Sequence, residues 1–220
     1  FGNAYFQMNQ KLGVRWSATK AFLRPVIGRD NLDVWTDAHV NRVVVESVDG
    51  MKRATGIELT VKGEARQTIN ADAEVLLAAG SIGSPQLLQA SGVGPGNILR
   101  GAGIPVSHDL RGVGENLQDH LQIRAIYKVS NTVTLNRRAN SLFSKASMAL
   151  EYFLKKTGPL TMPPSQLGAF ARSDASQQSA NIEWHVQPLS LDKFGEPLHE
   201  FDAITPSVCN LRPTSRGHVR

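Results

Sequence analysis

A short apolar run followed directly by small residues constrains the fold of this chain most strongly. Residues 75–79 read VLLAA, and such an uninterrupted run is typical of a strand buried on both faces. Gly80–Gly83 follow, Ser84 and Pro85 predict the start of a helix, and Gly92 predicts its end. A buried strand, a turn of small residues and a capped helix together predict the βα unit of a nucleotide-binding α/β fold.

The residues before this unit predict antiparallel strands. Apolar and polar side chains alternate over residues 31–37, and five valines lie within residues 40–48. Residues 57–61 alternate again, and residues 67–70 are a candidate third strand. Asp49-Gly50 is a turn signal between the two longer strands. We therefore predict a small antiparallel meander.

The residues after position 120 predict a second sheet and one amphipathic helix. Alternation over 122–129 and 182–187 predicts half-buried strands, and residues 203–211 are a candidate third. Residues 142–153 instead repeat apolar side chains at helical spacing, including Leu142 and Phe153. The sequence thus predicts an α/β part in residues 1–120 and an α+β part with an antiparallel sheet in residues 121–220.

Composition excludes several classes of protein. Apolar residues make up 41% of the 220 residues and charged residues 20%, which is ordinary for a globular protein. No apolar stretch reaches the length of a transmembrane helix. The net charge of +5 forms no basic stripe interleaved with aromatic residues, so we predict no nucleic-acid binding. A single cysteine, Cys209, excludes an internal disulfide and any multi-cysteine zinc site.

The usual catalytic motifs are absent. The six histidines form no HxxxH pair, so the spacing predicts no metal site. There is no GxSxG elbow and no GxxxxGK[ST] loop. Ser84 is interpreted as a helix cap and Cys209 as a core residue. The strongest signal is Gly80, where backbone can approach a ligand beside the free N–H groups of a helix start; a purely structural turn is the alternative.

Residues 80–94, GSIGSPQLLQASGVG, match at every constrained position the second signature of the glucose-methanol-choline (GMC) flavin oxidoreductases. Residues 112–120, GVGENLQDH, resemble the segment that follows it in those enzymes. Shorter matches occur in the expected order at residues 21–25, 29–34, 36–40, 158–161 and 168–170. The chain most resembles the choline-dehydrogenase-like branch of that family.

This resemblance implies FAD-dependent oxidation of a small alcohol to an aldehyde or ketone, with hydride transfer to the flavin. It implies an FAD-binding domain in residues 1–120, where Val40 contacts the adenine through its backbone and Ala79 and Gly80 pack beside the nucleotide. Residues 121–220 would belong to the substrate-binding domain, whose antiparallel sheet covers the flavin.

The resemblance also indicates what this chain does not contain. The family's GxGxxG segment and its catalytic histidine are not found, so we expect an internal fragment whose catalytic base lies beyond Arg220. The alcohol, the electron acceptor and the oligomeric state stay open, and a cytoplasmic location is expected. A non-catalytic binding module that retains the fold is the alternative.

Overall fold

The computed structural model describes residues 2–193 and 195–220, which fall into two compact units. One unit comprises Asp33–Asp119 with Thr214–Arg220, and the other comprises residues up to Leu32 with His120–Pro213. We call them the meander unit and the sheet unit. The roles predicted for residues 1–120 and 121–220, FAD binding and substrate binding, stay predictions.

The meander unit contains the predicted three-stranded sheet. Its strands β4 (Ala38–Val48), β5 (Met51–Val61) and β6 (Gln67–Asn70) are antiparallel and adjacent in that order. Asp49 and Gly50 both have positive φ angles, of 51° and 77°, as a two-residue hairpin turn requires. Val43 and Leu59 are 4% and 2% exposed and form the core of the sheet. The meander prediction is confirmed.

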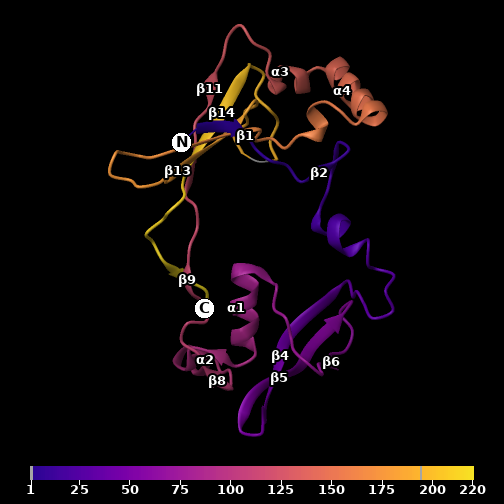
Figure 1. The fold of residues 1–220 in the computed structure, drawn as a ribbon, viewed down its shortest axis with the longest axis vertical. Helices are drawn as coiled ribbons and strands as arrows, with labels where there is room; N and C mark the ends of the chain where they lie inside the picture. Colours follow the sequence, from indigo (N-terminus) through magenta and orange to yellow (C-terminus); the bar gives the residue numbers. More distant parts are fainter. Residues whose placement is uncertain (1, 194) are drawn as a thin grey trace. The chain divides into compact units, whose positions relative to one another are not determined.

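Helix α1 (Gly80–Ala90) packs against β4, and Figure 1 shows the two side by side. The Val43 N–H donates to the Ser91 hydroxyl at 2.8 Å, which ties the end of the helix to the strand. Gly92, at φ +79°, turns the chain out of the helix as predicted. The helix begins four residues earlier than the predicted Ser84 cap. The Ser84 hydroxyl nevertheless accepts the Ala79 N–H at 3.0 Å, so it stabilises the helix start from within.

The remaining elements of the meander unit are short. They are β7 (Val93–Gly94), α2 (Gly96–Gly101), β8 (His108–Asp109), β9 (Glu115–Leu117) and β15 (Gly217–His218). Strands β7 and β8 pair in parallel, and β9 pairs with β15.

Two strand predictions in this unit are wrong. Residues 31–37 form no strand, and Asp37, at φ +53°, separates this segment from the start of β4. Residues 75–79 also form no strand in the described structure, and Leu76 is 80% exposed. A strand buried on both faces needs parallel neighbours to accept its hydrogen bonds, and the described residues provide none beside this segment.

The sheet unit is antiparallel throughout, in the order β1-β12-β13-β14-β10, with β11 also on β14. The strands are β1 (Gly2–Tyr5), β10 (Gln122–Arg124), β11 (Tyr127–Lys128), β12 (Leu167–Ala171), β13 (Ile182–Gln187) and β14 (Ala203–Asn210). The strand predictions for 182–187 and 203–211 are confirmed to within one residue. The single strand predicted over 122–129 is instead divided into β10 and β11. The first strand of the chain also joins this sheet, as Figure 1 shows.

The other elements of this unit are a small hairpin and several helices. They are β2 (Gln10–Lys11), β3 (Val14–Arg15), the π-helix η1 (Thr19–Leu23), α3 (Leu135–Asn140), α4 (Leu142–Lys155) and the 3-10 helix η2 (Pro159–Thr161). Helix α4 confirms the predicted helix but not its packing. Met148 is buried, whereas Leu142 and Phe153 on the predicted apolar face are 83% and 71% exposed. The periodicity of the sequence predicted the amphipathic helix. It did not predict which face of α4 contacts α3 and η2.

Asp202, a buried carboxylate, joins α3 to the start of β14. It accepts the Thr134 N–H at 2.8 Å and the Thr134 hydroxyl at 3.0 Å, and it pairs with Arg137 at 2.5 Å. The Thr134 N–H contributes most to lowering the pKa of Asp202, followed by the Thr134 hydroxyl and then the Arg137 charge, while burial opposes the shift.

The lowered pKa predicts a specific acid sensitivity. A carboxyl with a lower pKa in the folded state stabilises the fold above its unfolded pKa, and this contribution is lost as pH falls through the folded pKa. We expect Asp202→Asn to lower the urea midpoint near pH 7 and to lower it much less near pH 3. Urea unfolding of both proteins at the two pH values tests this. An equal effect at both would show that the charge of Asp202 does not contribute.

Candidate cofactor site

A cavity of about 530 Å³ lies in the meander unit, between β4, β5, α1 and the segment that leads into α1. Its volume is within the range of small-molecule and cofactor sites. The lining is mostly apolar and includes Val40, Ile57, Val75, Leu77 and Leu87. An aliphatic lining of this kind offers van der Waals contact to a flat ring.

The strand edge of this cavity is irregular. Val40 pairs with Leu59 and Arg42 with Glu58, so Asn41 is an extra residue with no counterpart on β5. Its side chain donates to the Thr60 hydroxyl at 3.0 Å, which holds the bulge in place. A β-bulge bends its strand and redirects the neighbouring backbone, and such features are common beside binding sites. The bulge therefore shapes the backbone of β4 at the predicted contact, Val40.

The helix edge of the cavity contains the other predicted residues. Ala79 lines the cavity, and Gly80 begins α1 directly after it. Gly80 has φ +82°, and no atom lies within 4 Å of the position that a Cβ would occupy. The backbone is thus open to a ligand at the point where the first N–H groups of a helix lack acceptors within the helix. The structure brings Val40 and Ala79 to one cavity, with Gly80 adjacent to it.

A second cavity, of about 260 Å³, lies on the sheet unit and has a different character. Strand pleating places alternate residues on one face, and here that face is polar on three neighbouring strands. The cavity is lined by His120, Gln122, Arg124, Ser165, His185, Gln187, Ser207 and Cys209. The sequence did not predict this cavity, because the register of β13 against β14 cannot be read from either strand alone.

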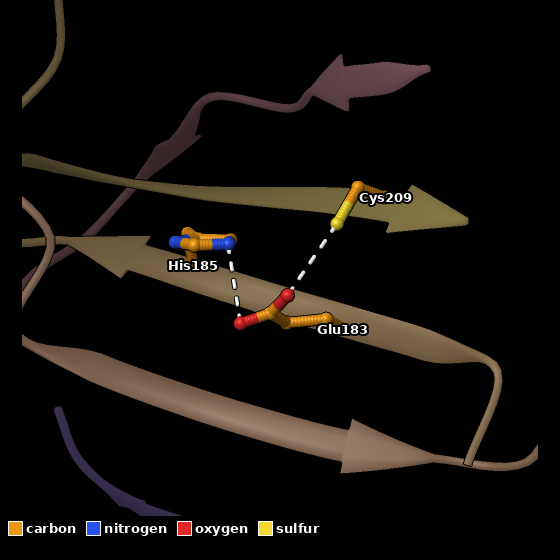
Figure 2. A group of neighbouring side chains, drawn as sticks. All are labelled: Glu183, His185 and Cys209. Carbon is orange, nitrogen blue, oxygen red and sulfur yellow. Dashed lines mark hydrogen bonds and ion pairs between the residues drawn. The ribbon is translucent and has the colours of Figure 1, made fainter. Parts of the chain in front are cut away.

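Glu183, His185 and Cys209 form a cluster on this face, as Figure 2 shows. The His185 Nε2 lies 3.3 Å from the Glu183 Oε1, and the Cys209 thiol donates to the Glu183 Oε2 at 3.7 Å. Burial, together with the neighbouring Glu183 carboxylate, raises the pKa of the Cys209 thiol. Cys209 is buried as predicted, at 4% exposure, but it also contacts a charged group.

The chain belongs to the GMC oxidoreductase family, whose model matches residues 2–122. The mixed α/β fold class with antiparallel sheets is thereby confirmed, and FAD is the cofactor of this family.

Two curated relatives and one solved structure illustrate the match. An alcohol dehydrogenase [acceptor] of Pseudomonas putida is 36% identical, over 99% of this chain and 39% of its own length. An oxygen-dependent choline dehydrogenase of Brucella ovis is 37% identical, over 94% of this chain and 36% of its own. A formate oxidase of Aspergillus oryzae RIB40, studied for modification of its FAD, matches with a TM-score of 0.83 at 20% identity, over 97% of this chain and 41% of its own.

The chain therefore spans less than half the length of the relatives that it matches. None of the helices in the described part of the chain combines the length and the apolar character that a membrane span requires.

Proposed function

We propose that this chain is part of an FAD-dependent enzyme that oxidises an alcohol to an aldehyde or ketone. In this proposal the meander unit holds the adenine end of FAD, and the polar face of the sheet unit belongs to the substrate-binding domain. The supporting observation is the β4–α1 cavity: Val40 and Ala79, two of the three predicted contact residues, line it. The chain that contains this cavity belongs to the GMC family.

The residues present fit the adenine end of the cofactor. The aliphatic lining offers van der Waals contact to a flat heterocycle, while the bulged backbone beside Val40 offers polar groups to the ring edge. The open approach at Gly80 leaves room for the atoms that follow the adenine. FAD, when bound, supplies the acceptor for the hydride of the alcohol carbon. We assign no residue of this chain as the catalytic base.

The names of the relatives support alcohols as the substrate class, with choline as one member to test. The specific alcohol and the electron acceptor are not part of the proposal. A cytoplasmic location stays a prediction.

Gly80→Val is expected to weaken FAD binding at least about tenfold, or about 1.4 kcal/mol. The added side chain would fill the open space beside the cavity, where the glycine backbone is exposed to a ligand. Titration of the protein into FAD, followed by the quenching of flavin fluorescence, measures the dissociation constant.

Gly103→Val is the matched control. Gly103 also has a positive φ, of 73°, and open space at its Cβ position, but it does not line the cavity. The two variants therefore carry similar backbone strain, and only Gly80→Val should change the dissociation constant. Equal FAD affinity in both would contradict the assignment of Gly80.

The activity itself is tested by visible absorption spectroscopy of the natural-length protein that contains this chain, with FAD, before and after anaerobic addition of single alcohols, choline included. Flavin bands that bleach with an alcohol are the expected result. A protein that stays colourless after FAD is added would favour the alternative, a binding module that retains the fold without the cofactor.

A further inference from the structure

The polar face of the sheet unit brings three metal-binding side chains together. Glu183 and His185 are two residues apart on β13 and so project from the same face. Cys209 lies directly opposite Glu183 on β14. A carboxylate oxygen, an imidazole nitrogen and the thiol sulfur all lie within 4.8 Å of one another.

In the structure these three groups contact one another directly. The Cys209 thiol donates to one Glu183 oxygen, and the His185 ring pairs with the other. A metal ion bound by the same three atoms would replace these contacts, because each group would offer a lone pair to the ion. The exposed fractions of the Glu183 and His185 side chains are 14% and 32%, so the cluster is shielded but reachable from the second cavity.

We propose that Glu183, His185 and Cys209 bind a divalent thiophilic metal ion, with Zn²⁺ as the ion that fits best. Thiolate, imidazole and carboxylate are the zinc ligands of proteins, and three of them leave the fourth tetrahedral position to water. Mg²⁺ and Ca²⁺ prefer oxygen ligands, so the buried sulfur argues against them. On binding, Cys209 loses its proton to solvent, and His185 binds as the neutral imidazole.

A separate observation supports a ligand in this cavity. Gln187 is buried, with 7% of the residue exposed, and its side-chain Oε1 is buried and has no hydrogen-bond partner in the described part of the chain. Gln187 follows His185 by two residues on β13 and lines the same cavity. A buried acceptor normally has a donor, and a metal-bound water in the cavity would provide one.

The charges of the site are also consistent with a divalent ion. Arg124 lines the cavity, and its positive charge repels a cation bound there. The Glu183 carboxylate and the Cys209 thiolate together carry two negative charges, which match the charge of the metal ion. This pairing explains how a cation can be held beside a guanidinium group.

The spacing of the histidines predicted no metal site, and the proposal departs from that prediction. Motifs such as HxxxH describe ligands on one element, whereas these ligands come from two consecutive strands, β13 and β14, that pair in the sheet. The proposal does not depend on the proposed oxidation of alcohols.

Titration of the chain with Co²⁺, a spectroscopic substitute for Zn²⁺, tests the proposal directly. We expect a thiolate-to-cobalt absorption band that saturates at one ion per chain and that Zn²⁺ removes by displacement. Cys209 is the only cysteine of the chain, so such a band reports this residue alone. Binding should also release protons, measurable with a pH indicator.

Variants distinguish a metal site with three ligands from metal binding to a single thiol. Cys209→Ser should abolish the band. Glu183→Gln and His185→Gln should each weaken Co²⁺ affinity by at least the about 10- to 100-fold that loss of an outer-shell partner of a metal ligand costs. Asp192→Asn is the matched control, because Asp192 also pairs with a histidine, His199, at 3.3 Å but has no thiol nearby. It should leave the affinity unchanged.

Circular dichroism of each sample first verifies its strand content. Absence of the band from a folded wild-type sample would overturn the proposal. Unchanged affinity in both Glu183→Gln and His185→Gln would also overturn it, because the metal ion would then bind to a lone cysteine.

Discussion

Asn136→Ala is expected to lower the free energy of unfolding by about 3 kcal/mol or more. Asn136 is fully buried in α3. Its amide donates to the Ser190 carbonyl at 3.0 Å and the His199 carbonyl at 2.9 Å, and its oxygen accepts the Ser190 N–H at 2.8 Å. Alanine would leave these backbone groups buried without partners and would also create a small cavity.

Asn140→Ala provides the comparison for this effect. Asn140 donates to the same His199 carbonyl at 3.0 Å, but its side chain is exposed, so water can replace it. We expect a loss below about 1 kcal/mol. Urea unfolding of both variants gives the two values. Similar small losses in both would show that the Asn136 hydrogen bonds do not hold α3 to the sheet unit.

Gly92→Ala is expected to destabilise the meander unit by about 3 kcal/mol. Gly92 adopts φ +79°, which an alanine adopts only with strain, and the added Cβ would lie 2.4 Å from the Pro105 carbonyl oxygen. Backbone atoms must move to relieve that contact. Because Gly92 ends α1, the change should also disturb the helix edge of the cofactor cavity and weaken FAD binding.

Gly103→Ala isolates the conformational part of this cost. Gly103 has a similar φ, of 73°, with no atom within 4 Å of the Cβ position. Its expected loss is about 1 kcal/mol, from strain alone. Thermal unfolding followed by circular dichroism compares the two variants. Equal losses would mean that the close approach of Pro105 relaxes at no cost.

Local sequence patterns predicted much of the fold. The valine-rich strand β4, the Asp49-Gly50 turn and the alternation of β13 each depend on neighbouring residues, and each is confirmed. The wrong predictions concern partners that sequence patterns cannot supply. Residues 75–79 have the composition of a buried strand but no strand beside them among the residues that the structure describes. Helix α4 packs through Met148 instead of its predicted apolar face.

Some residues of the candidate sites were also predicted from the sequence, and others were not. Val40 and Ala79 were predicted from the resemblance and line one cavity, although their contact with FAD stays a prediction. The Asn41 bulge and the Glu183–His185–Cys209 cluster depend on cross-strand register. A shift of one residue would move each side chain to the opposite face, so neither could be predicted from one strand alone.

Competition between nucleotides for the FAD site tests the central claim most directly. The β4–α1 cavity is assigned to the adenine end of FAD, so a ligand with adenosine diphosphate alone should bind there. We predict that ADP displaces FAD from the protein, whereas FMN, which lacks the adenosine, does not, and that Gly80→Val weakens ADP and FAD alike. Displacement of FAD by FMN but not by ADP would contradict the assignment of this cavity.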